Sequence, residues 1–298
     1  MNNKTNYLVG FNAMRFELKE IHFIKSSKSE IENKCNNAIQ QYDFSDYNNG
    51  GYIKGWIERE GLNNILYIAS PNVINLPTDS ANLFRNSESQ IFNLKYLEKI
   101  EFDNINTSNV TDMSFMFFDL ENITKLDLSM FDTSNVTDME DMFGCCYKLQ
   151  EIKLESFNTQ KLTNMCEMFF ECKSIEKLSL KHFDTTNVED FELTFGYMEN
   201  IKELDLSSFR TTGDICTTYR MFKDCNNLEK IDIRQFIFDN VLEDDYYSIK
   251  NNTLPKYYEM FRGIPSDARI YVKSNKDKEQ VKIIGMGLIE DKNIIVKK

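Results

Sequence analysis

The sequence predicts an α/β solenoid, a stack of about six 26-residue strand-turn-helix coils behind a small amino-terminal α+β unit. Phe131, Phe157, Phe183 and Phe209 open the triplets FDT, FNT, FDT and FRT at three successive spacings of 26 residues. Within each unit, alternating apolar residues precede apolar residues three apart. A unit this short cannot bury two apolar faces alone, so neighbouring units must stack.

The first half of each unit has the pattern of a strand. In Leu126-Asp127-Leu128-Ser129 apolar and polar residues alternate, which is typical of a strand with one buried face. Successive parallel strands need a crossover of a dozen or more residues, and the rest of the unit supplies it.

The second half of each unit has a spacing that predicts a short helix. Thr137 and Glu140 form a capping-box pattern at its start. A column of acids follows from unit to unit, and it caps helices or, in principle, collects calcium between coils. The apolar residues of one unit are three, three, one and three residues apart: Val136, Met139, Met142, Phe143 and Cys146. The acid column is Asp112, Asp138 and Asp190, with Asn164 at the same repeat position.

The shared interior is expected to hold one aromatic ring and one small apolar residue per coil. Leu120 and Met198 occupy the position at which other units carry Cys, so we expect buried thiols rather than metal ligands. No CxxC spacing supports a zinc site, and no cofactor is expected. The predicted core residues are Phe117, Phe143, Phe169, Phe195, Phe222, Cys146, Cys172 and Cys225.

Polar residues that flank the buried strand positions form charged columns across the predicted sheet. Adjacent strands are about 4.8 Å apart, so opposite charges in neighbouring coils can pair. Either the column is a self-neutralising ladder that sets register, or it recognises a charged partner. The first column begins at Lys99 and continues, with alternating sign, through the candidate binding residues Lys125, Glu151, Lys177, Glu203 and Lys230.

The last unit carries an insertion at 237–259, because 39 residues rather than 26 separate Met221 from Met260. Insertions in repeat proteins project as loops. Its tyrosines either contact a partner protein, since Tyr provides a large contact area at low entropy cost, or fold back over the last coil. These candidates are Tyr246, Tyr247, Tyr257 and Tyr258.

The chain is expected to divide at 1–69, 70–266 and 267–298. In the first segment, strand-like stretches at 52–57 and 65–69 follow a short helix containing Ile31 and Cys35. This segment covers the open end of the repeats or forms a separate docking or effector domain. The last segment is expected to cap the carboxy-terminal end.

The repeat motifs resemble those of a known family. The string LDLSMFDTSNVTDMEDMFGCC at 126–146, with its relatives over roughly 94–264, resembles the BspA-like leucine-rich-repeat family of the mycoplasma-lipoprotein type. The resemblance implies a right-handed leucine-rich solenoid that binds other macromolecules, commonly as an adhesin at the cell surface or in secreted form. Without a recognisable signal peptide, the sequence as given favours the cytoplasm instead.

Charge and motif content narrow the function. The chain has 35 Lys and Arg against 47 Asp and Glu, a net charge of −12, which disfavours nucleic acid and anionic lipid as partners. No apolar run approaches the roughly 20 residues of a membrane span. The two histidines, His22 and His182, accompany no catalytic motif, so no enzyme is expected.

We therefore expect a non-enzymatic solenoid that binds a protein, or a glycan, in adhesin-like recognition. One alternative is an intracellular, acidic inhibitor or immunity-type binder of a basic protein. A second alternative is an enzyme or effector activity in residues 1–69. The oligomeric state is left open by the sequence.

Overall fold

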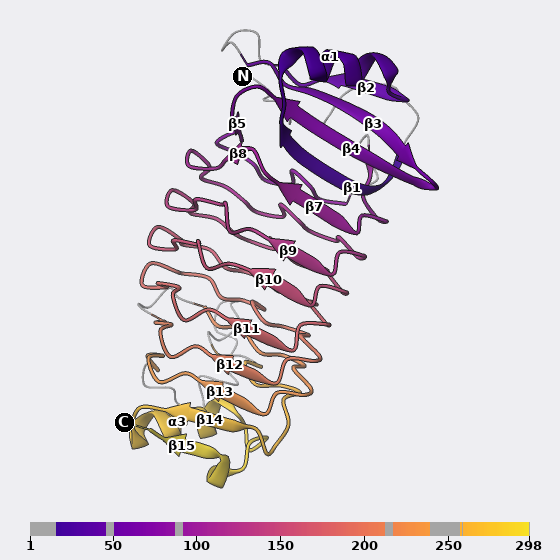
Figure 1. The fold of residues 1–298 in the computed structure, drawn as a ribbon. Coiled ribbons are helices and arrows are strands. Elements are labelled where there is room, and N and C mark those ends of the chain that lie inside the picture. The colour runs from indigo at the N-terminus through magenta and orange to yellow at the C-terminus, as the bar shows by residue number, and fades with distance from the viewer. Residues whose placement is uncertain are drawn as a thin grey trace, which may run out of the picture.

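The computed structural model describes residues 16–45, 51–86, 92–211, 217–238, 257 and 259–297. Figure 1 shows an elongated stack of flattened coils, with an amino-terminal sheet and helix at one end and a carboxy-terminal sheet and helix at the other. The strands of successive coils lie on the same side of the stack.

The amino-terminal end combines one helix with a mixed sheet. Strands β2, β3 and β4 pair antiparallel, and β1 runs parallel to β4. The helix begins with a capping box, in which the Ser27 side chain and the Glu30 carboxylate satisfy each other's backbone N–H. The elements are β1 (Phe16–Lys25), α1 (Lys28–Asn37), β2 (Gln40–Asp43), β3 (Lys54–Glu60) and β4 (Asn63–Ser70).

The amino-terminal sheet continues into the first coils. Strand β1 also pairs in parallel with β6 (Phe92–Asn93) and β7 (Lys99–Phe102), while β5 (Ile74–Asn75) pairs with β8 (Ile105–Asn106). One hydrophobic core runs from β1 to the carboxy-terminal helix. The division at 1–69, 70–266 and 267–298 stays a prediction, and β1 links the first two segments by hydrogen bonds.

Each following coil contributes one short parallel strand. Strand β9 pairs with β10, and β11 to β15 pair in chain order. The helix α3 (Asn275–Ile284) and the 3-10 turn η1 (Asp291–Asn293) complete the carboxy-terminal end. The strands are β9 (Lys125–Asp127), β10 (Glu151–Lys153), β11 (Lys177–Ser179), β12 (Glu203–Asp205), β13 (Lys230–Asp232), β14 (Arg269–Val272) and β15 (Ile294–Val296).

The predicted fold class is wrong, because the coils contain strands and turns where the sequence predicts helices. The two α-helices of the described residues, α1 and α3, both lie outside the coils. In the segment predicted to be helical, Met142 N–H donates to Met139 O and Gly144 N–H donates to Asp141 O, which makes consecutive β-turns. Asp141 and Cys145 have φ values of 50° and 60°. A right-handed helix cannot pass through these left-handed residues. The strand-turn-helix leucine-rich solenoid is therefore replaced by a stack of β-coils with curled sheets.

The apolar spacing of three misled the prediction because consecutive turns produce it as well. Residues between the turn hydrogen bonds donate to the next coil instead, as Phe143 N–H does to Met168 O at 3.0 Å. The acid column starts these turns rather than capping helices: Asp138 Oδ1 accepts from Glu140 N–H at 2.9 Å, and Asp112 Oδ1 accepts from Ser114 N–H at 2.9 Å.

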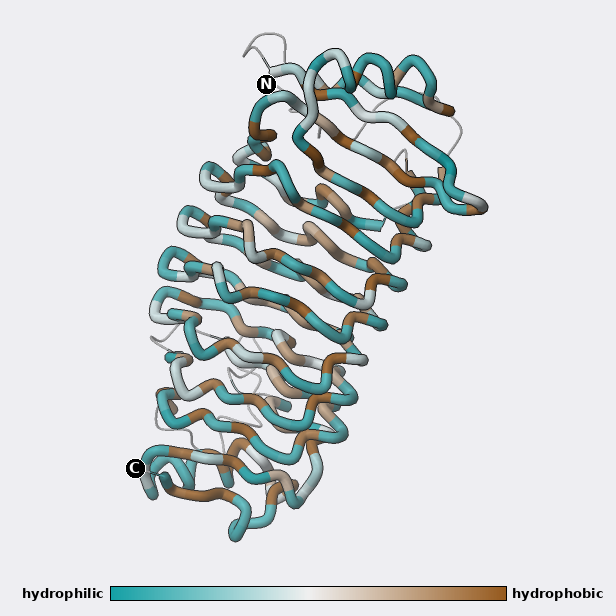
Figure 2. Tube along the Cα trace, viewed as in Figure 1, coloured by the Kyte–Doolittle hydropathy of each residue, from teal (hydrophilic) through white to brown (hydrophobic). Residues whose placement is uncertain are grey.

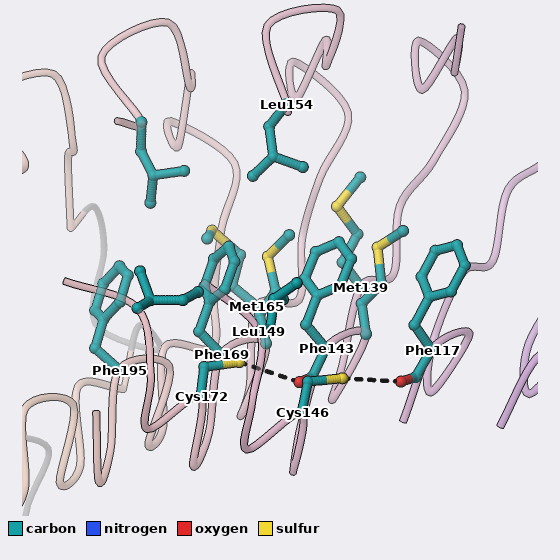
Figure 3. Close-up of a cluster of buried hydrophobic side chains, with 14 of the residues drawn as sticks. Phe117, Met139, Phe143, Cys146, Leu149, Leu154, Met165, Phe169, Cys172 and Phe195 are labelled. Atoms are coloured by element: carbon teal, nitrogen blue, oxygen red, sulfur yellow. Dashed lines mark hydrogen bonds between the residues drawn. The ribbon is translucent and has the colours of Figure 1, made fainter. Parts of the chain in front are cut away.

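A ladder of phenylalanine rings fills the core, and Figure 2 shows hydrophobic residues recurring from coil to coil. Figure 3 shows three of the coil-to-coil ring pairs, with centroids 5.8, 5.4 and 6.0 Å apart. The thiols beside the rings are hydrogen-bonded, since Cys146 Sγ–H and Cys172 Sγ–H each donate to the Phe carbonyl of the preceding coil at 3.2 Å. The buried residues are Phe117, Phe143, Phe169, Phe195, Phe222, Cys146, Cys172 and Cys225, each at most 1% exposed.

The threonine of each FDT-like triplet is a buried clip between coils. Thr133 Oγ1–H donates to Asn158 O at 2.9 Å and its oxygen accepts from Asn158 N–H at 2.8 Å. Making both hydrogen bonds requires a side chain that donates and accepts, and the threonine hydroxyl does both. The same pair of bonds forms at Thr107, Thr159, Thr185 and Thr211.

Candidate interaction surfaces

The coils expose two long faces. The sheet face consists of the outward side chains of β7 and β9 to β13. The turn face consists of the outward side chains of the turn segments at 111–121, 137–147, 163–173, 189–199 and 217–226. Both faces repeat from coil to coil, so a side chain on either one has neighbours about 4.8 Å away along the stack.

The first charged column lies on the sheet face and is paired in part. Lys125 Nζ is 2.9 Å from a Glu151 carboxylate oxygen, and Lys230 Nζ is 3.2 Å from one of Glu203. These side chains are mostly exposed, so each pair contributes at most about 1 kcal/mol. Lys177 forms no ion pair with any residue that the structure describes. The ladder is interrupted at its middle.

The neighbouring columns of the sheet face neutralise themselves as well. Lys153 Nζ is 2.5 Å from Asp127 Oδ2, and hydrogen bonds from Lys153 and Ser129 lower the pKa of Asp127 to about 2. Lys181 pairs with Asp205 at 3.2 Å. These charges point to a face that sets register more than to one that attracts a partner.

The turn face, in contrast, carries partly buried aromatic side chains. The Arg85 guanidinium lies over the rings of Phe115 and Phe118, with 5.1 and 4.8 Å to the ring centroids. Phe170 meets Tyr197 edge to face at 5.4 Å. Aromatic residues and Arg are enriched in protein interfaces and among the residues that contribute most binding energy.

An acidic strip runs between these aromatic residues. Burial is the first cause of a raised pKa at each of its carboxyl groups, and nearby carboxylates raise it further. None of the five forms an ion pair with a described residue; Arg85 lowers the pKa of Asp141 and Arg220 that of Glu192, but in both cases burial and neighbouring carboxylates raise it more. The strip consists of Glu140, Asp141, Glu167, Asp190 and Glu192.

Asp141 is the most perturbed member of the acidic strip. Its side chain sits in a left-handed turn, it is 8% exposed, and its Oδ1 has no hydrogen-bond partner. Burial, then Glu167 and Glu140, raise its pKa to about 7. A side chain on Gly144 would collide with this oxygen, because a Cβ there would be 2.2 Å away. Glycine therefore makes room for the carboxylate.

The chain belongs to the family described as Mycoplasma protein of unknown function, DUF285. A model of this family matches residues 78–177 and 146–254, more than half of the chain. The match confirms the resemblance to a mycoplasma-type repeat family, and it carries no leucine-rich-repeat assignment. No curated protein and no solved structure matched the chain.

The structure describes only a few residues of the insertion at 237–259. Tyr257 is 7% exposed, its ring packs against Phe238, and its hydroxyl donates to Ile237 O at 3.3 Å. This arrangement favours a tyrosine that folds back over the last coil. Tyr246, Tyr247 and Tyr258 lie outside the described residues.

A cavity of about 440 Å³ lies between the amino-terminal sheet and the first coils. Phe23, Phe44, Ile68 and Leu83 are among its lining residues, and those that the structure describes include no Asp, Glu, His, Lys or Arg. Its described lining therefore holds no carboxylate or imidazole. In the described parts of the chain, no three potential ligands are grouped to hold a metal ion, and neither helix has the length and apolar character of a membrane span.

Sequence reasoning did not find the turn face as a surface. The predicted helices did not show which residues of the turn segments lie beside one another in neighbouring coils. A signal was present, however: Phe118 stands at the repeat position where Gly144 and Gly196 follow in later coils. An aromatic residue outside the core columns indicates a side chain that packs on the surface of the coil, as Phe118 does against Phe115.

Proposed function

We propose that this protein is a non-enzymatic, protein-binding repeat module that engages a basic partner protein through its turn face. The observation that carries the proposal is the acidic strip of Glu140, Asp141, Glu167, Asp190 and Glu192, which forms no ion pair with the described residues and whose pKa values are all raised. Partly buried aromatic side chains flank the strip and supply apolar contact area.

Physical chemistry supports the turn face over the sheet face. Crowded, partly desolvated carboxylates raise one another's pKa, and an approaching Lys or Arg relieves that repulsion as it binds. On the sheet face, by comparison, a partner must displace pairs such as Lys125 with Glu151 before it gains any charge contact. The net charge of −12 adds long-range attraction for a basic partner.

The family-level resemblance bears on the narrower role. Resemblance to BspA-like repeats implies adhesin-like recognition at a cell surface, with a protein or glycan ligand. The acidic strip favours a protein, because Lys and Arg side chains are the cations that it complements. A role as an acidic inhibitor of a basic protein rests on the same surface and differs in location.

The experiment compares two matched variants in binding to a partner captured from the native cell. The turn-face variant carries Glu140→Gln, Glu167→Gln and Glu192→Gln. The sheet-face variant carries Lys125→Gln and Glu151→Gln. We expect the turn-face variant to bind at least tenfold more weakly, with a smaller dependence on salt, since each lost charge contact weakens steering and affinity.

The sheet-face variant is expected to bind like the unmodified protein. Isothermal titration at two salt concentrations distinguishes the faces. Equal affinity of the turn-face variant and the unmodified chain, together with weakened binding by the sheet-face variant, would move the interface to the sheet.

A further inference from the structure

The cavity between the amino-terminal sheet and the first coils has the size of a ligand site. Its volume is about 440 Å³, more than ten times the roughly 30 Å³ that one water molecule occupies in the liquid. Pockets for small molecules measure about 300–1,000 Å³ and often lie where two structural units meet. This cavity meets both criteria, since β1 and β4 line it from the sheet and residues 72–78 line it from the first coil.

The deep part of the cavity is apolar and its rim is exposed. The lining residues Phe23, Ile68 and Leu83 are 4%, 3% and 7% exposed. Val73 and Asn109 also line the cavity and are exposed residues, so the cavity opens to solvent beside them. A ligand can enter at this rim, and burial of its apolar surface against the deep residues favours binding.

The aromatic residues of the lining are held in place by their neighbours. The Phe44 ring stacks on Tyr42, with the ring centroids 5.8 Å apart. A side chain at Gly55 would collide with the Phe44 ring, because a Cβ there would be 2.6 Å from Phe44 Cε2. Phe23 is stacked on Phe102 of the first coil, with centroids 5.6 Å apart. A lining that is already ordered reduces the entropy cost of binding.

Ser70 provides a hydrogen-bond donor in the buried part of the lining. It follows Ile68 by two residues in β4, so both side chains are on the same face of the sheet, and both residues line the cavity. Ser70 is 2% exposed, and its Oγ accepts a hydrogen bond from Asn72 N–H at 3.1 Å. The hydroxyl hydrogen of Ser70 has no acceptor among the described residues. Since a hydroxyl accepts and donates at once, Ser70 can donate to a ligand oxygen.

The lining selects against charged ligands. The lining residues that the structure describes include no Asp, Glu, His, Lys or Arg, so they offer an ion no opposite charge. A carboxylate or an ammonium group that leaves water without such a partner loses much of its hydration free energy. Hydrogen-bonding groups without charge can be accommodated, because the polar lining residues Ser70, Asn72 and Asn109 are neutral.

We propose that this cavity binds a small, uncharged molecule that has an apolar ring system and one oxygen acceptor. The ring system packs against Phe23, Phe44 and Ile68, and the oxygen accepts a hydrogen bond from Ser70 Oγ–H. This site goes beyond the proposed function, because it takes a small molecule, whereas the turn face binds a basic protein. The two sites share no residue, so each proposal can fail while the other stands.

Three naphthalene derivatives of nearly equal size and shape test the ligand chemistry. Naphthyl methyl ketone has the ring system and the oxygen acceptor. Naphthoate has the same ring system with a charged carboxylate, and isopropenylnaphthalene has a CH₂ group in place of the ketone oxygen. Equilibrium dialysis against the full chain measures the affinity for each. We expect saturable binding of the ketone, and binding of naphthoate that is weaker by at least about tenfold, because its charge has no partner in the described lining.

The variant Ser70→Ala tests the hydrogen bond. It should weaken binding of the ketone by about threefold to tenfold, the range of one neutral hydrogen bond, and it should leave binding of isopropenylnaphthalene unchanged. The comparison of two ligands in one variant separates the lost hydrogen bond from a general change of the cavity. The triple turn-face variant should bind the ketone like the unmodified chain.

A second pair of variants tests the location of the site. Leu76 is 7% exposed and lines the cavity, so Leu76→Trp should fill part of it and weaken binding of all three compounds. The matched control is Leu62→Trp, because Leu62 is 98% exposed and does not line the cavity. It should bind the ketone like the unmodified chain. In the unmodified chain, the ketone should slow hydrogen exchange at the amides of 68–70 and 74–76 and leave exchange at 203–205 unchanged.

Three results would overturn the proposed site. The first is the absence of saturable ketone binding to the unmodified chain up to the solubility limit of the ketone. The second is binding of naphthoate as tight as that of the ketone, since the lining would then not select by charge. The third is an equal loss of ketone and isopropenylnaphthalene binding in Ser70→Ala, which would mean that no ligand oxygen accepts from Ser70.

Discussion

The sheet face and the turn face of the same coils differ in their coil-to-coil backbone hydrogen bonds and in the pairing of their charges. On the turn side, coil-to-coil backbone bonds continue across β10 and β11, where the sheet side is interrupted. On the sheet side most charges are paired, while the acidic strip of the turn side is not. The same repeat therefore builds one face whose charges are mostly paired and another face whose acidic strip forms no ion pair with the described residues.

The turn face can carry unpaired acids because backbone hydrogen bonds hold its coils together. Alternate N–H groups along each turn segment bond to the next coil, and the remaining ones close turns within the coil. Outward side chains are then not needed to hold the stack, and acids or aromatic residues can occupy these positions. On the sheet face, three-residue strands provide few backbone bonds, so side-chain pairs assist register.

The largest expected effect compares two neighbouring residues, Phe169 in the core and Phe170 on the turn face. Phe169→Ala removes a ring that is 0% exposed and stacked between Phe143 and Phe195. It should lower the free energy of unfolding by about 3–5 kcal/mol. Phe170→Ala, on the turn face, should cost under about 1.5 kcal/mol. Equilibrium denaturation measures both, and equal losses would contradict the placement of Phe170 outside the core.

The next effect tests the threonine clip between the coils of β10 and β11. Thr159 is 2% exposed, and its hydroxyl satisfies both the N–H and the C=O of Asp184. Thr159→Val keeps the shape but leaves two buried backbone groups unpaired, which should cost about 2–4 kcal/mol. The matched control is Thr163→Val, an exposed threonine with one backbone bond, which should cost under about 1 kcal/mol. A neutral Thr159→Val would show that the clip is dispensable.

The acidic strip predicts a pH dependence with a defined sign. The folded state raises the pKa of Asp141 from 3.8 to about 7, so the folded state binds this proton more tightly than the unfolded state does. Its contribution to stability is full below pH 3.8 and is lost as pH rises through 7. From pH 5 to pH 8 the free energy of unfolding should fall by about 2–3 kcal/mol from this group.

The variant Asp141→Asn should remove most of that fall, leaving the smaller contributions of Glu167 and Glu140, which have the same sign. Asp127→Asn is the control with the opposite sign, because the folded pKa of Asp127 is lowered to about 2 and matters only in acid. Denaturant titrations at several pH values report the slopes. A fall of unchanged size in Asp141→Asn would place the proton elsewhere.

Particular residues show how far the sequence alone could reach. The 26-residue spacing of Phe131 and its sisters predicted the repeat, and the alternation at Leu126 and Leu128 predicted the strands. The helix prediction failed because left-handed residues such as Asp141 have no reliable signature when they are not glycine. Apolar spacing reports which side chains point inward, and it does not report the backbone path between them.

The candidate surfaces show the same limit. Charge alternation in the first column was readable, but the lack of an ion pair between Lys177 and any described residue depends on side-chain geometry that the sequence does not give. The acidic strip joins residues such as Glu140, Glu167 and Glu192, which are neighbours only once the coil-to-coil register is known. Repeat periodicity supplies that register. The turn geometry decides which of the aligned side chains face outward.

The smallest expected effect tests whether the sheet-face ladder is interrupted where the structure places the break. Lys125→Glu places like charges opposite each other at the paired position Glu151, and it should lower stability by about 0.2–1 kcal/mol. The exchange of both residues, Lys125→Glu with Glu151→Lys, should recover it. Lys177→Gln should have almost no effect, because Lys177 has no ion pair with a described residue and the neutral amide places no like charge opposite Glu203. The comparison needs replicate denaturation curves precise to about 0.2 kcal/mol. A loss in Lys177→Gln as large as that in Lys125→Glu would mean that the charges interact along the whole column. In that case Lys177 would take part in the ladder, and the first column would be paired from Lys125 to Lys230.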